Sequence, residues 1–552
     1  MKRHGIAWAV FIVACAVAYG TLMQPVGCNQ TAHYSLIESL SDHTPHIDRY
    51  SDQTCDTAYV DGHYFAAKAP GLALATLPWY VVLHAVGAIP VNPDLHGGFP
   101  AAMLSLPRRA LWEVGLVGTV LPALLLLVLI GTVAERIAPG SGLPTAAFAG
   151  LGTLIFPFAT VLFSHVLATT LAFAGFALLF SRRDPLLAGV AAGLAVVVDF
   201  PLALVTLALA VYAWPRTPRF AAGAILGMLP AAAFNQWAFH DPFRLSYANA
   251  VLVPGKSGHE VLGANTSGFF GIGVPSLRAG TELLLSPRGL FILSPILLVG
   301  AAGLLLNWRR GLRREAVLCA SLAVAYLVYN AGYYVPFGGY VPGPRFLIPI
   351  IPFLLLGLPV AISTWPATTL VLGGVSIGAM TVATAAEPLL GNDDTHSWVT
   401  RWENGDFAQS VLTLVGQGHG WLAVTPFLLA VAVAVVAAFS QLPRPRLTAR
   451  AVAALVGWLI CFKAAPALLH TDRAVHQAFG LVTVVALVVI ALAMLVRLEG
   501  VALLLGAPLL LLAIPGVAAH TKESLALVLT AGTIFIAVEI YRSRGIRLRE
   551  SA

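Results

Sequence analysis

The chain has 552 residues and a formal net charge of +7, and 58% of its residues are hydrophobic whereas only 10% are charged. A soluble domain carries roughly 25% charged residues, so the composition excludes an ordinary soluble protein. Repeated apolar windows of about 20 residues indicate a polytopic membrane protein. We therefore predict an all-α bundle of transmembrane helices with about 13–16 spans. The windows lie near 5–24, 110–134, 144–161, 164–181, 185–199, 200–214, 219–238, 289–306, 315–333, 346–364, 367–386, 421–440, 450–467, 475–496, 500–517 and 522–541.

The distribution of the basic residues predicts the topology. With the N-terminus in the cytoplasm, the short loops that carry Arg182, Arg183 and the Arg309–Arg314 cluster fall on the cytoplasmic side. The long loops, which hold most of the acidic residues, then fall on the opposite side, as the positive-inside rule requires. The net positive charge therefore indicates an integral membrane protein and not a protein that binds nucleic acid.

The chain divides into four parts. Residues 1–24 form a first span that is retained, because no small-residue cleavage site follows it. Residues 25–109 form the first extracytoplasmic loop, in which the apolar stretch 71–90 is a juxtamembrane or re-entrant helix. Residues 110–365 form a transmembrane core with external loops 239–288 and 334–345. Residues 366–552 form the C-terminal spans with an external loop at 387–420. All four large loops lie on one side of the membrane, where they can converge.

The first loop holds the most polar segment of the chain, from Ile47 to Gly71. A catalytic base needs a carboxylate that stays ionised within hydrogen-bond reach of an acceptor hydroxyl. Asp48, Asp56 and Asp61 are the candidates for this role. The competing interpretation is that these aspartates are solvated turn formers.

Two basic residues are candidates for holding a phosphate. Lys68 precedes a Pro-Gly turn that starts an apolar helix, and its ammonium can act as a point charge. Arg345 follows a Gly/Pro-rich turn that leads into a span, and its guanidinium suits bidentate phosphate contact. Each is equally well interpreted as an anchor at the membrane interface.

Further polar groups lie close to the membrane. His165 and Asp199 occur within apolar windows, where ionisable groups are functional hypotheses by default. Arg244 follows a span directly and is a candidate for lining the same outer cavity. For His165 and Asp199, placement at the interface is the competing interpretation, whereas for Arg244 it is simple exposure to water.

The cysteines and the known sequence motifs limit which disulfides, metals and cofactors we expect. Cys28 and Cys55 both fall in the first external loop, on the oxidising side, where a disulfide between them or two separate thiols are compatible with the sequence. The sequence has no HExxH, CxxC, EF-hand, Walker A or dinucleotide signature. We therefore predict no metal and no cofactor.

Several of these segments together resemble the GT-C superfamily of polyprenyl-phosphate-sugar glycosyltransferases. Lys68-Ala69-Pro70-Gly71 is similar to the Lys-Pro-Pro segment of the branch that contains protein O-mannosyltransferases and lipid A aminoarabinose transferases. The motifs around Asp48, Asp56 and Asp61-Gly62-His63-Tyr64 resemble a bacterial subgroup. Similar stretches occur at Ser164-His165, Gly268–Gly289 and Gly338–Leu347. The resemblance covers roughly residues 1–365.

The resemblance implies a fold and an activity. It implies a GT-C-like membrane enzyme of the bacterial plasma membrane that moves a sugar from a polyprenyl-phosphate donor to a glycan, lipid or protein acceptor. The reaction would invert the anomeric centre on the extracytoplasmic face, with a loop aspartate as base and with Lys68 and Arg345 on the donor phosphate. His63 and Tyr64 would lie near the substrate.

One departure from the family pattern affects the choice of base. The family often places an acidic pair directly after the first span, and here those positions are Cys28-Asn29-Gln30. The base would then be Asp48 or Asp56, with Asp61 third. Two alternative functions remain open at this point, namely a flippase for a lipid-linked saccharide and an enzyme like the O-antigen ligases and polymerases.

Overall fold

The computed structural model describes residues 2–89, 98–250, 271–339, 341–389, 395–416, 420–440, 442 and 448–470. The chain forms two compact units, Met1–Pro445 and Arg446–Ala552. The second unit is described only for helix α22 (Ala449–His470), and the spans expected from residue 475 onward lie outside the described residues. The features below belong to the first unit.

The described chain is mostly helical, with four short strands, which confirms the expected all-α class. The longer helices are α1 (Lys2–Thr21), α2 (Cys28–Ser41), α3 (Gly71–Ala85), α5 (Arg108–Gly115), α6 (Leu121–Ile137), α7 (Gly142–Gly152), α9 (Ser164–Phe180), α10 (Pro185–Val198), α11 (Ala203–Tyr212), α12 (Thr217–Phe239), α13 (Leu277–Leu285), α15 (Ile296–Arg309), α16 (Arg313–Ala331), α18 (Leu358–Thr364), α19 (Pro366–Ala385), α20 (Thr395–Asn404) and α21 (Trp421–Phe439).

Short elements connect these helices. The short α-helices are α4 (Ala101–Ser105), α8 (Ile155–Ala159), α14 (Leu290–Leu293) and α17 (Ile351–Leu354). The strands are β1 (Leu22–Met23), β2 (Thr57–Val60), β3 (His63–Ala66) and β4 (Gln409–Ser410). The 3-10 and π segments are η1 (Asp48–Gln53), η2 (Leu116–Val120), η3 (Phe200–Leu202), η4 (Ser246–Asn249), η5 (Arg345–Ile350), η6 (Leu355–Gly357) and η7 (Val411–Val415).

Length and apolarity identify the helices that can cross a membrane. Within the described residues, four qualify, namely Arg108–Ile137, Arg345–Thr364, Pro366–Ala385 and Trp421–Phe439. A fifth span results if the bent pair Leu277–Leu293 and Ile296–Arg309 is counted as one. Shorter apolar helices include Gly5–Thr21, Ser164–Phe180 and Pro185–Val198. These helices make the protein an integral membrane protein, as the composition predicts.

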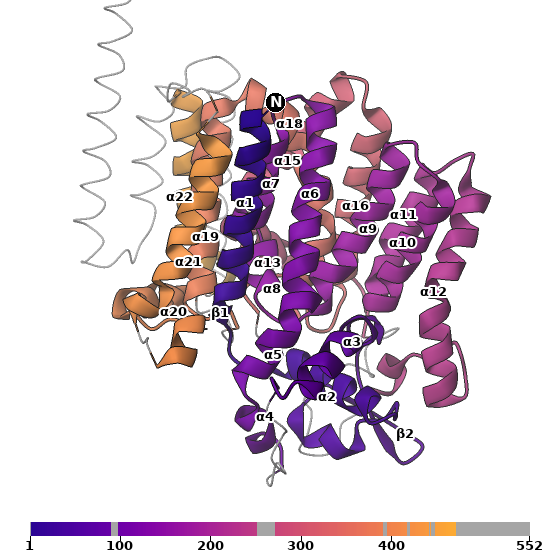
Figure 1. Cartoon of the computed structure of the whole chain (residues 1–552). Helices are drawn as coiled ribbons and strands as arrows, with labels where there is room; N and C mark the ends of the chain where they lie inside the picture. The colour runs from indigo at the N-terminus through magenta and orange to yellow at the C-terminus, as the bar shows by residue number, and fades with distance from the viewer. Residues whose placement is uncertain are drawn as a thin grey trace, which may run out of the picture. The chain divides into compact units, whose positions relative to one another are not determined.

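The first loop forms a small layer at one end of the helices. In Figure 1, α2, α3, α4 and β2 lie together at the lower end of the long helices, whereas the N-terminus of α1 lies at the upper end. The region expected as a juxtamembrane or re-entrant helix is α3, which is 15 residues long and carries Pro78 inside it. This length is too short for an upright span of the hydrocarbon core.

Helices α10 and α12 approach each other closely through glycines. A Cβ atom on Gly189 or Gly193 would lie 2.0 Å and 2.2 Å from carbonyl oxygens of α12, and Gly223 and Gly227 face the α10 backbone in the same way. This is the small-xxx-small packing of membrane helices, in which the backbones themselves are in contact. It fixes the position of α10, whose end carries Asp199.

Candidate functional site

A tight hairpin organises the first loop. Strands β2 and β3 pair antiparallel with Thr57 opposite Ala66 and Val60 opposite His63. The two residues between the strands, Asp61 and Gly62, have φ angles of 50° and 93°. Asp-Gly with two positive φ angles is the preferred two-residue hairpin turn, because its twist matches that of the strands. The turn sets the register of the two strands. This register places the start of β2 beside the end of β3.

Asp56 and Lys68 meet at the open end of this hairpin. Asp56 precedes β2, and its carbonyl accepts a hydrogen bond from the Ala67 N–H at 2.9 Å. Lys68 Nζ lies 2.6 Å from Asp56 Oδ2, and the two side chains are only 6% and 10% exposed. The lysine is held from its other side by η4, where Ser246 Oγ donates to the Lys68 carbonyl and the Tyr247 ring lies 5.9 Å from Nζ.

Arg345 reaches the same point from a distant part of the chain. Lys68 Nζ and Arg345 Nη1 are both donors, so the Asn29 side-chain amide is assigned with its oxygen toward them. In that orientation the oxygen accepts hydrogen bonds from Lys68 Nζ at 3.3 Å and from Arg345 Nη1 at 3.2 Å. We call Asn29, Asp56, Lys68 and Arg345 the cation cluster. The sequence-predicted phosphate ligands, which lie far apart in the chain, are therefore brought together by the fold.

The rest of the Arg345 guanidinium is surrounded by aromatic rings. Its Cζ atom lies 5.4 Å from the ring centre of Phe163 and 4.9 Å from that of Phe346. Its Nε atom is buried and has no hydrogen-bond partner. In the part of the chain that the structure describes, no carboxylate lies within ion-pair distance of Arg345. A buried donor without a partner is costly, and it is a common feature of sites that bind a ligand.

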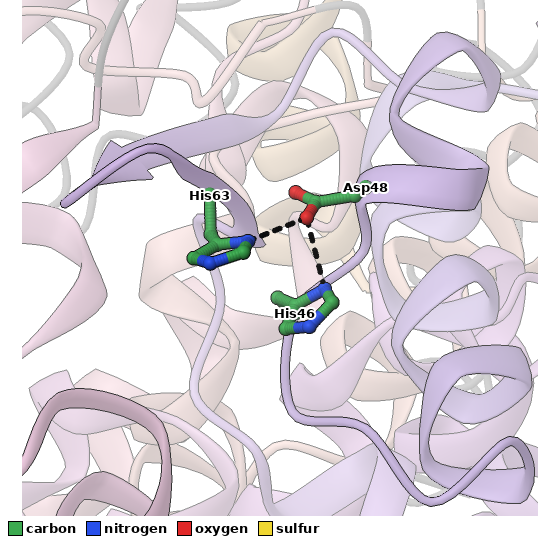
Figure 2. A group of neighbouring side chains, drawn as sticks. All are labelled: His46, Asp48 and His63. Carbon is green, nitrogen blue, oxygen red and sulfur yellow. Dashed lines mark hydrogen bonds and ion pairs between the residues drawn. The ribbon is translucent and has the colours of Figure 1, made fainter.

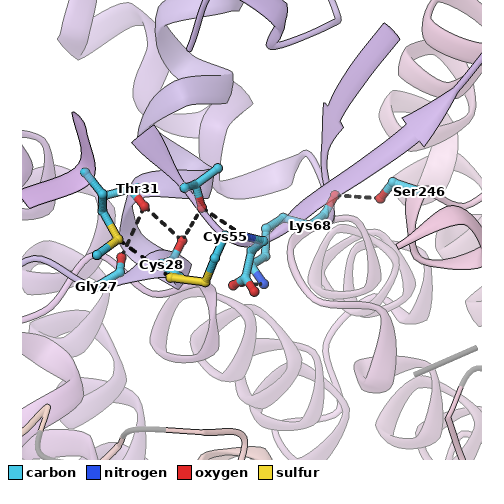
Figure 3. A network of polar contacts seen from close by, with 9 residues as sticks. Gly27, Cys28, Thr31, Cys55, Lys68 and Ser246 are labelled. Atoms are coloured by element: carbon cyan, nitrogen blue, oxygen red, sulfur yellow. Dashed lines mark hydrogen bonds and ion pairs between the residues drawn. A yellow bond between two sulfur atoms is a disulfide. The ribbon is translucent and has the colours of Figure 1, made fainter. Parts of the chain in front are cut away.

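A disulfide holds two members of the cation cluster. Cys28 and Cys55 are bonded, with a Cα–Cα distance of 5.3 Å, so Asn29 and Asp56 each follow one half of the bridge. Beside it, Thr54 Oγ1 donates to the Cys28 carbonyl at 2.8 Å and accepts from the Asp56 N–H at 3.1 Å. Figure 3 shows the disulfide together with the contact between Ser246 and Lys68. The bridge connects the start of α2 to the start of the hairpin.

His33 belongs to the same region, and the sequence analysis did not identify it. It lies one helical turn after Asn29 on α2, it is fully buried, and neither ring nitrogen has a hydrogen-bond partner. Burial lowers the pKa of His33 well below its usual range, and the nearby Lys68 ammonium acts in the same direction. The imidazole is therefore neutral. The i, i+4 spacing from Asn29 is the signal that could have found it.

His165 and Asp199 form a second pair. His165 Nδ1 lies 2.6 Å from Asp199 Oδ2, and the side chains are 4% and 12% exposed. His165 Nε2 is buried and has no hydrogen-bond partner. The His165 ring also packs edge-on against Phe346, which contacts Arg345. An imidazole oriented through one nitrogen by a carboxylate, with the other nitrogen available, is a typical arrangement of a general base.

Close backbone packing connects Lys68 to this second pair. Gly71 begins α3, and a Cβ atom there would lie 2.6 Å from the Val197 carbonyl oxygen and 2.7 Å from Val198 Cα. Asp199 follows Val198 directly. The Lys68–Gly71 segment therefore lies against the end of α10.

The remaining predicted residues lie apart from the cation cluster. Asp61 is in the hairpin turn with its side chain 82% exposed, and its carboxylate lies 3.5 Å from Arg244 Nη1. Asp48 lies 2.6 Å from His63 Nδ1 and accepts a hydrogen bond from the Tyr64 N–H. Of the three candidate bases, only Asp56 is within the cluster.

The external loops converge, as far as the structure describes them. Arg288 Nη1 donates to the Val341 carbonyl at 3.0 Å and so supports the turn that carries Arg345. Strand β1, at the end of α1, pairs with β4 of the 387–420 loop. Glu387 accepts from both Arg108 and Arg401, at 2.7 Å and 2.6 Å.

Comparisons with known proteins give one structural likeness to report. No protein-family model matches the sequence, and no curated protein matches it. The fold is similar to the crystal structure of ArnT from Cupriavidus metallidurans bound to undecaprenyl phosphate, at 15% identity over 92% of this chain and 76% of that chain, with a TM-score of 0.40. At this identity and TM-score the likeness assigns no activity to the chain.

Proposed function

We propose that this protein is a membrane glycosyltransferase that moves a sugar from a polyprenyl-phosphate donor to an acceptor hydroxyl on the extracytoplasmic face. The observation that carries the proposal is the convergence of Lys68 and Arg345 on the amide oxygen of Asn29. Two cations that donate to one oxygen lie close enough to contact a single phosphate group. A bidentate guanidinium and a lysine point charge are the groups that bind phosphate best in proteins.

The charge balance of the cation cluster favours an anionic ligand. Lys68 is neutralised by Asp56, whereas Arg345 has no carboxylate within ion-pair distance among the described residues. Within the cluster, two neighbouring cations share one carboxylate, so the Arg345 guanidinium has no counter-charge in direct contact with it in a poorly solvated place, which is costly. A phosphate would compensate that charge and also provide an acceptor for Arg345 Nε.

The position of both cations suits a lipid phosphate. Arg345 is the first residue of the apolar helix Arg345–Thr364, which is long enough to span a membrane. Lys68 lies three residues before the apolar helix α3. Cations at the ends of apolar helices lie at the level of the lipid headgroups. A phosphate that carries a polyprenyl chain can thus reach the cluster while its chain stays in the membrane. Undecaprenyl phosphate, to which ArnT was bound when crystallised, is the first carrier to test.

The proposed reaction is a single displacement. The acceptor oxygen forms a bond to the anomeric carbon, and the bond from that carbon to the phosphate oxygen breaks with inversion. The electron pair of the broken bond stays on the phosphate, where Arg345 and Lys68 stabilise the additional charge. The Lys68 ammonium pairs with the phosphate when the donor binds, and this frees the Asp56 carboxylate from its ion pair. The acceptor proton then moves to Asp56.

His165 is the second candidate for the base. Its Nδ1 is oriented by Asp199 and its Nε2 is buried without a partner, so it can accept a proton without an ion pair being rearranged. Two substitutions distinguish the two candidate bases. Asp56→Asn would abolish transfer if Asp56 is the base, and His165→Gln would abolish it if the imidazole is.

A transfer assay on the purified protein in detergent tests the proposal. Labelled undecaprenyl-phosphate sugars and a cell-envelope acceptor fraction would be incubated with the wild type, Arg345→Gln, Asp56→Asn and His165→Gln. Arg278→Gln is the control, because Arg278 is an exposed arginine on α13 whose ion pair among the described residues is with Glu282. We expect transfer by the wild type and the control, with at least a tenfold loss in Arg345→Gln. Normal transfer by Arg345→Gln would refute the phosphate contact.

The same preparation separates a transferase from a flippase. The wild type would be reconstituted into vesicles that contain a fluorescent undecaprenyl-phosphate sugar. If the lipid crosses the bilayer and no sugar is released, the protein is a transporter and the proposed chemistry is wrong. Transfer without lipid crossing supports the enzyme.

A further inference from the structure

A second group of polar side chains lies at the other end of the hairpin from the cation cluster. His63 is the first residue of β3, and Lys68 follows the last residue of β3 by two positions. Up to about 17 Å of extended chain therefore separates the two groups. The second group consists of His46, Asp48 and His63. In the part of the chain that the structure describes, their ligand atoms all lie within 4.8 Å of one another.

From this geometry we propose that His46, Asp48 and His63 bind a divalent first-row transition-metal ion, with zinc as the preferred ion. Figure 2 shows both imidazole rings directed at one carboxylate oxygen of Asp48. His63 Nδ1 lies 2.6 Å and His46 Nδ1 lies 3.1 Å from Asp48 Oδ2. Two imidazoles and one carboxylate are a typical ligand set for such ions.

The three ligands are close enough to reach one ion after their side chains rearrange. Ligands on a tetrahedral zinc lie about 2.0–2.1 Å from the metal, so two of them are about 3.3 Å apart. The observed separations from Asp48 Oδ2 are 2.6 Å and 3.1 Å, and the two imidazole rings are stacked with their centroids 4.5 Å apart. Binding an ion therefore requires the ligands to separate by up to about 0.7 Å and one ring to rotate. His46 Nδ1 is buried, and its 3.1 Å contact with Asp48 Oδ2 does not have the geometry of a hydrogen bond, so a metal would give this nitrogen a well-directed partner.

The backbone around the ligands is held in place. The second oxygen of Asp48 accepts a hydrogen bond from the Tyr64 N–H at 2.6 Å, and the Ile47 N–H donates to the Tyr64 carbonyl at 2.7 Å. The segment of His46 to Asp48 is thus fixed to the start of β3 on both sides of the ligands. A hydrogen bond to the second carboxylate oxygen orients a ligand in the way that supports metal affinity.

The site is open on one side. The side chains of His46 and Asp48 are each 35% exposed, and that of His63 is 52% exposed. Three protein ligands leave a fourth tetrahedral position for a water molecule or an oxygen of another molecule. Such an ion would connect the start of η1 to β3. Asp48 would then be a metal ligand rather than a catalytic base. This inference does not depend on the proposed transferase activity.

Metal titration of the full chain tests the site. The tag-free protein in detergent would be stripped with chelator, dialysed and titrated with Zn²⁺ by calorimetry, and a parallel sample would be titrated with Co²⁺ and followed by visible absorption. We expect one Zn²⁺ per chain and Co²⁺ bands typical of nitrogen and oxygen ligands. Bands that indicate thiolate ligation would place the metal on the free cysteines Cys15, Cys319 or Cys461 and would overturn the proposal.

Variants assign the binding to these three residues. His63→Ala removes a half-exposed ligand, so it is expected to fold normally while its affinity for Zn²⁺ falls at least about tenfold. Asp48→Asn keeps the shape of the side chain and should also weaken binding. His43→Asn is the matched control, because His43 is nearby and has a φ angle of 59° that asparagine tolerates. Absence of stoichiometric Zn²⁺ binding by the wild type, or equal losses in His43→Asn and His63→Ala, would refute the site.

Discussion

Lys68 Nζ lies 2.6 Å from Asp56 Oδ2, and both side chains are almost completely buried. This ion pair joins the two ends of the β2–β3 hairpin and, through Asn29, connects the first loop to Arg345. In the proposed reaction the pair must open when a phosphate arrives, so it has a structural role in the free protein and a different role in the complex.

The first prediction concerns the stability of this pair. Lys68→Met and Asp56→Asn should each destabilise the protein by about 3–5 kcal/mol, because each breaks a buried ion pair by removing one of its two charges. The double variant should be more stable than either single variant, since it contains neither charge. Thermal unfolding in detergent measures the stability of the wild type, the two single variants and the double variant. Additive losses in the double variant would show that the two groups do not interact.

The second prediction concerns the disulfide. The bridge joins two residues that are 27 positions apart, and removing it in the double variant Cys28→Ser/Cys55→Ser should cost about 3 kcal/mol. Affinity for undecaprenyl phosphate should also fall, because Asn29 and Asp56 follow the two cysteines directly. Chemical denaturation and lipid-phosphate binding are the measurements. Reductant should have the same effect on the wild type and none on the double variant, and an effect on the double variant would contradict this assignment.

The third prediction concerns Gly71. A methyl group there would overlap the backbone of Val197 and Val198, and backbone atoms cannot move aside as a side chain can. Gly71→Ala should therefore destabilise the protein by about 1–3 kcal/mol and should reduce transfer by displacing Lys68. Gly378→Ala is the control, because no atom lies within 4 Å of a Cβ at that helical position. It should be neutral or slightly stabilising. Equal behaviour of the two variants in thermal unfolding would exclude the close contact.

Part of this architecture could be predicted from the sequence. Apolar windows predict the helices because burial in lipid requires long apolar runs, and Arg345–Thr364 and Trp421–Phe439 agree closely with the windows at 346–364 and 421–440. Lys68 and Arg345 could be selected because a cation at the end of an apolar run is conspicuous. Their convergence is a finding of the structure.

The partners of the cations could not be predicted. Asn29 and His33 carry no charge, and their contacts depend on tertiary packing between segments that are far apart in the chain. The choice among Asp48, Asp56 and Asp61 depends on the hairpin register, which the Asp61-Gly62 turn sets. The group of His46, Asp48 and His63 has no recognised spacing motif, because its third ligand comes from strand β3, fifteen residues after Asp48.

The last prediction concerns His33 and pH. Its pKa in the folded protein lies well below its usual range because the ring is buried beside Lys68, whereas in the unfolded chain it is about 6.5. Below that pH the unfolded state binds more protons than the folded state, so protonation of His33 destabilises the fold as the pH falls from about 6.5. Above pH 6.5 this contribution is constant. In His33→Met, the loss of stability between pH 6.5 and pH 5 should therefore be smaller than in the wild type.

A control variant shows whether the pH dependence of stability comes from His33 or from other histidines. His43→Asn removes a histidine outside the cluster and should keep the wild-type pH dependence, so an equal change in both variants would contradict the assignment to His33. At pH 7.5, His33→Met should be at least as stable as the wild type, because neither nitrogen of His33 has a partner to lose. Buried polar groups without partners are retained mainly at functional sites. We therefore expect the same variant to transfer sugar more slowly than the wild type, although its stability at that pH is not reduced.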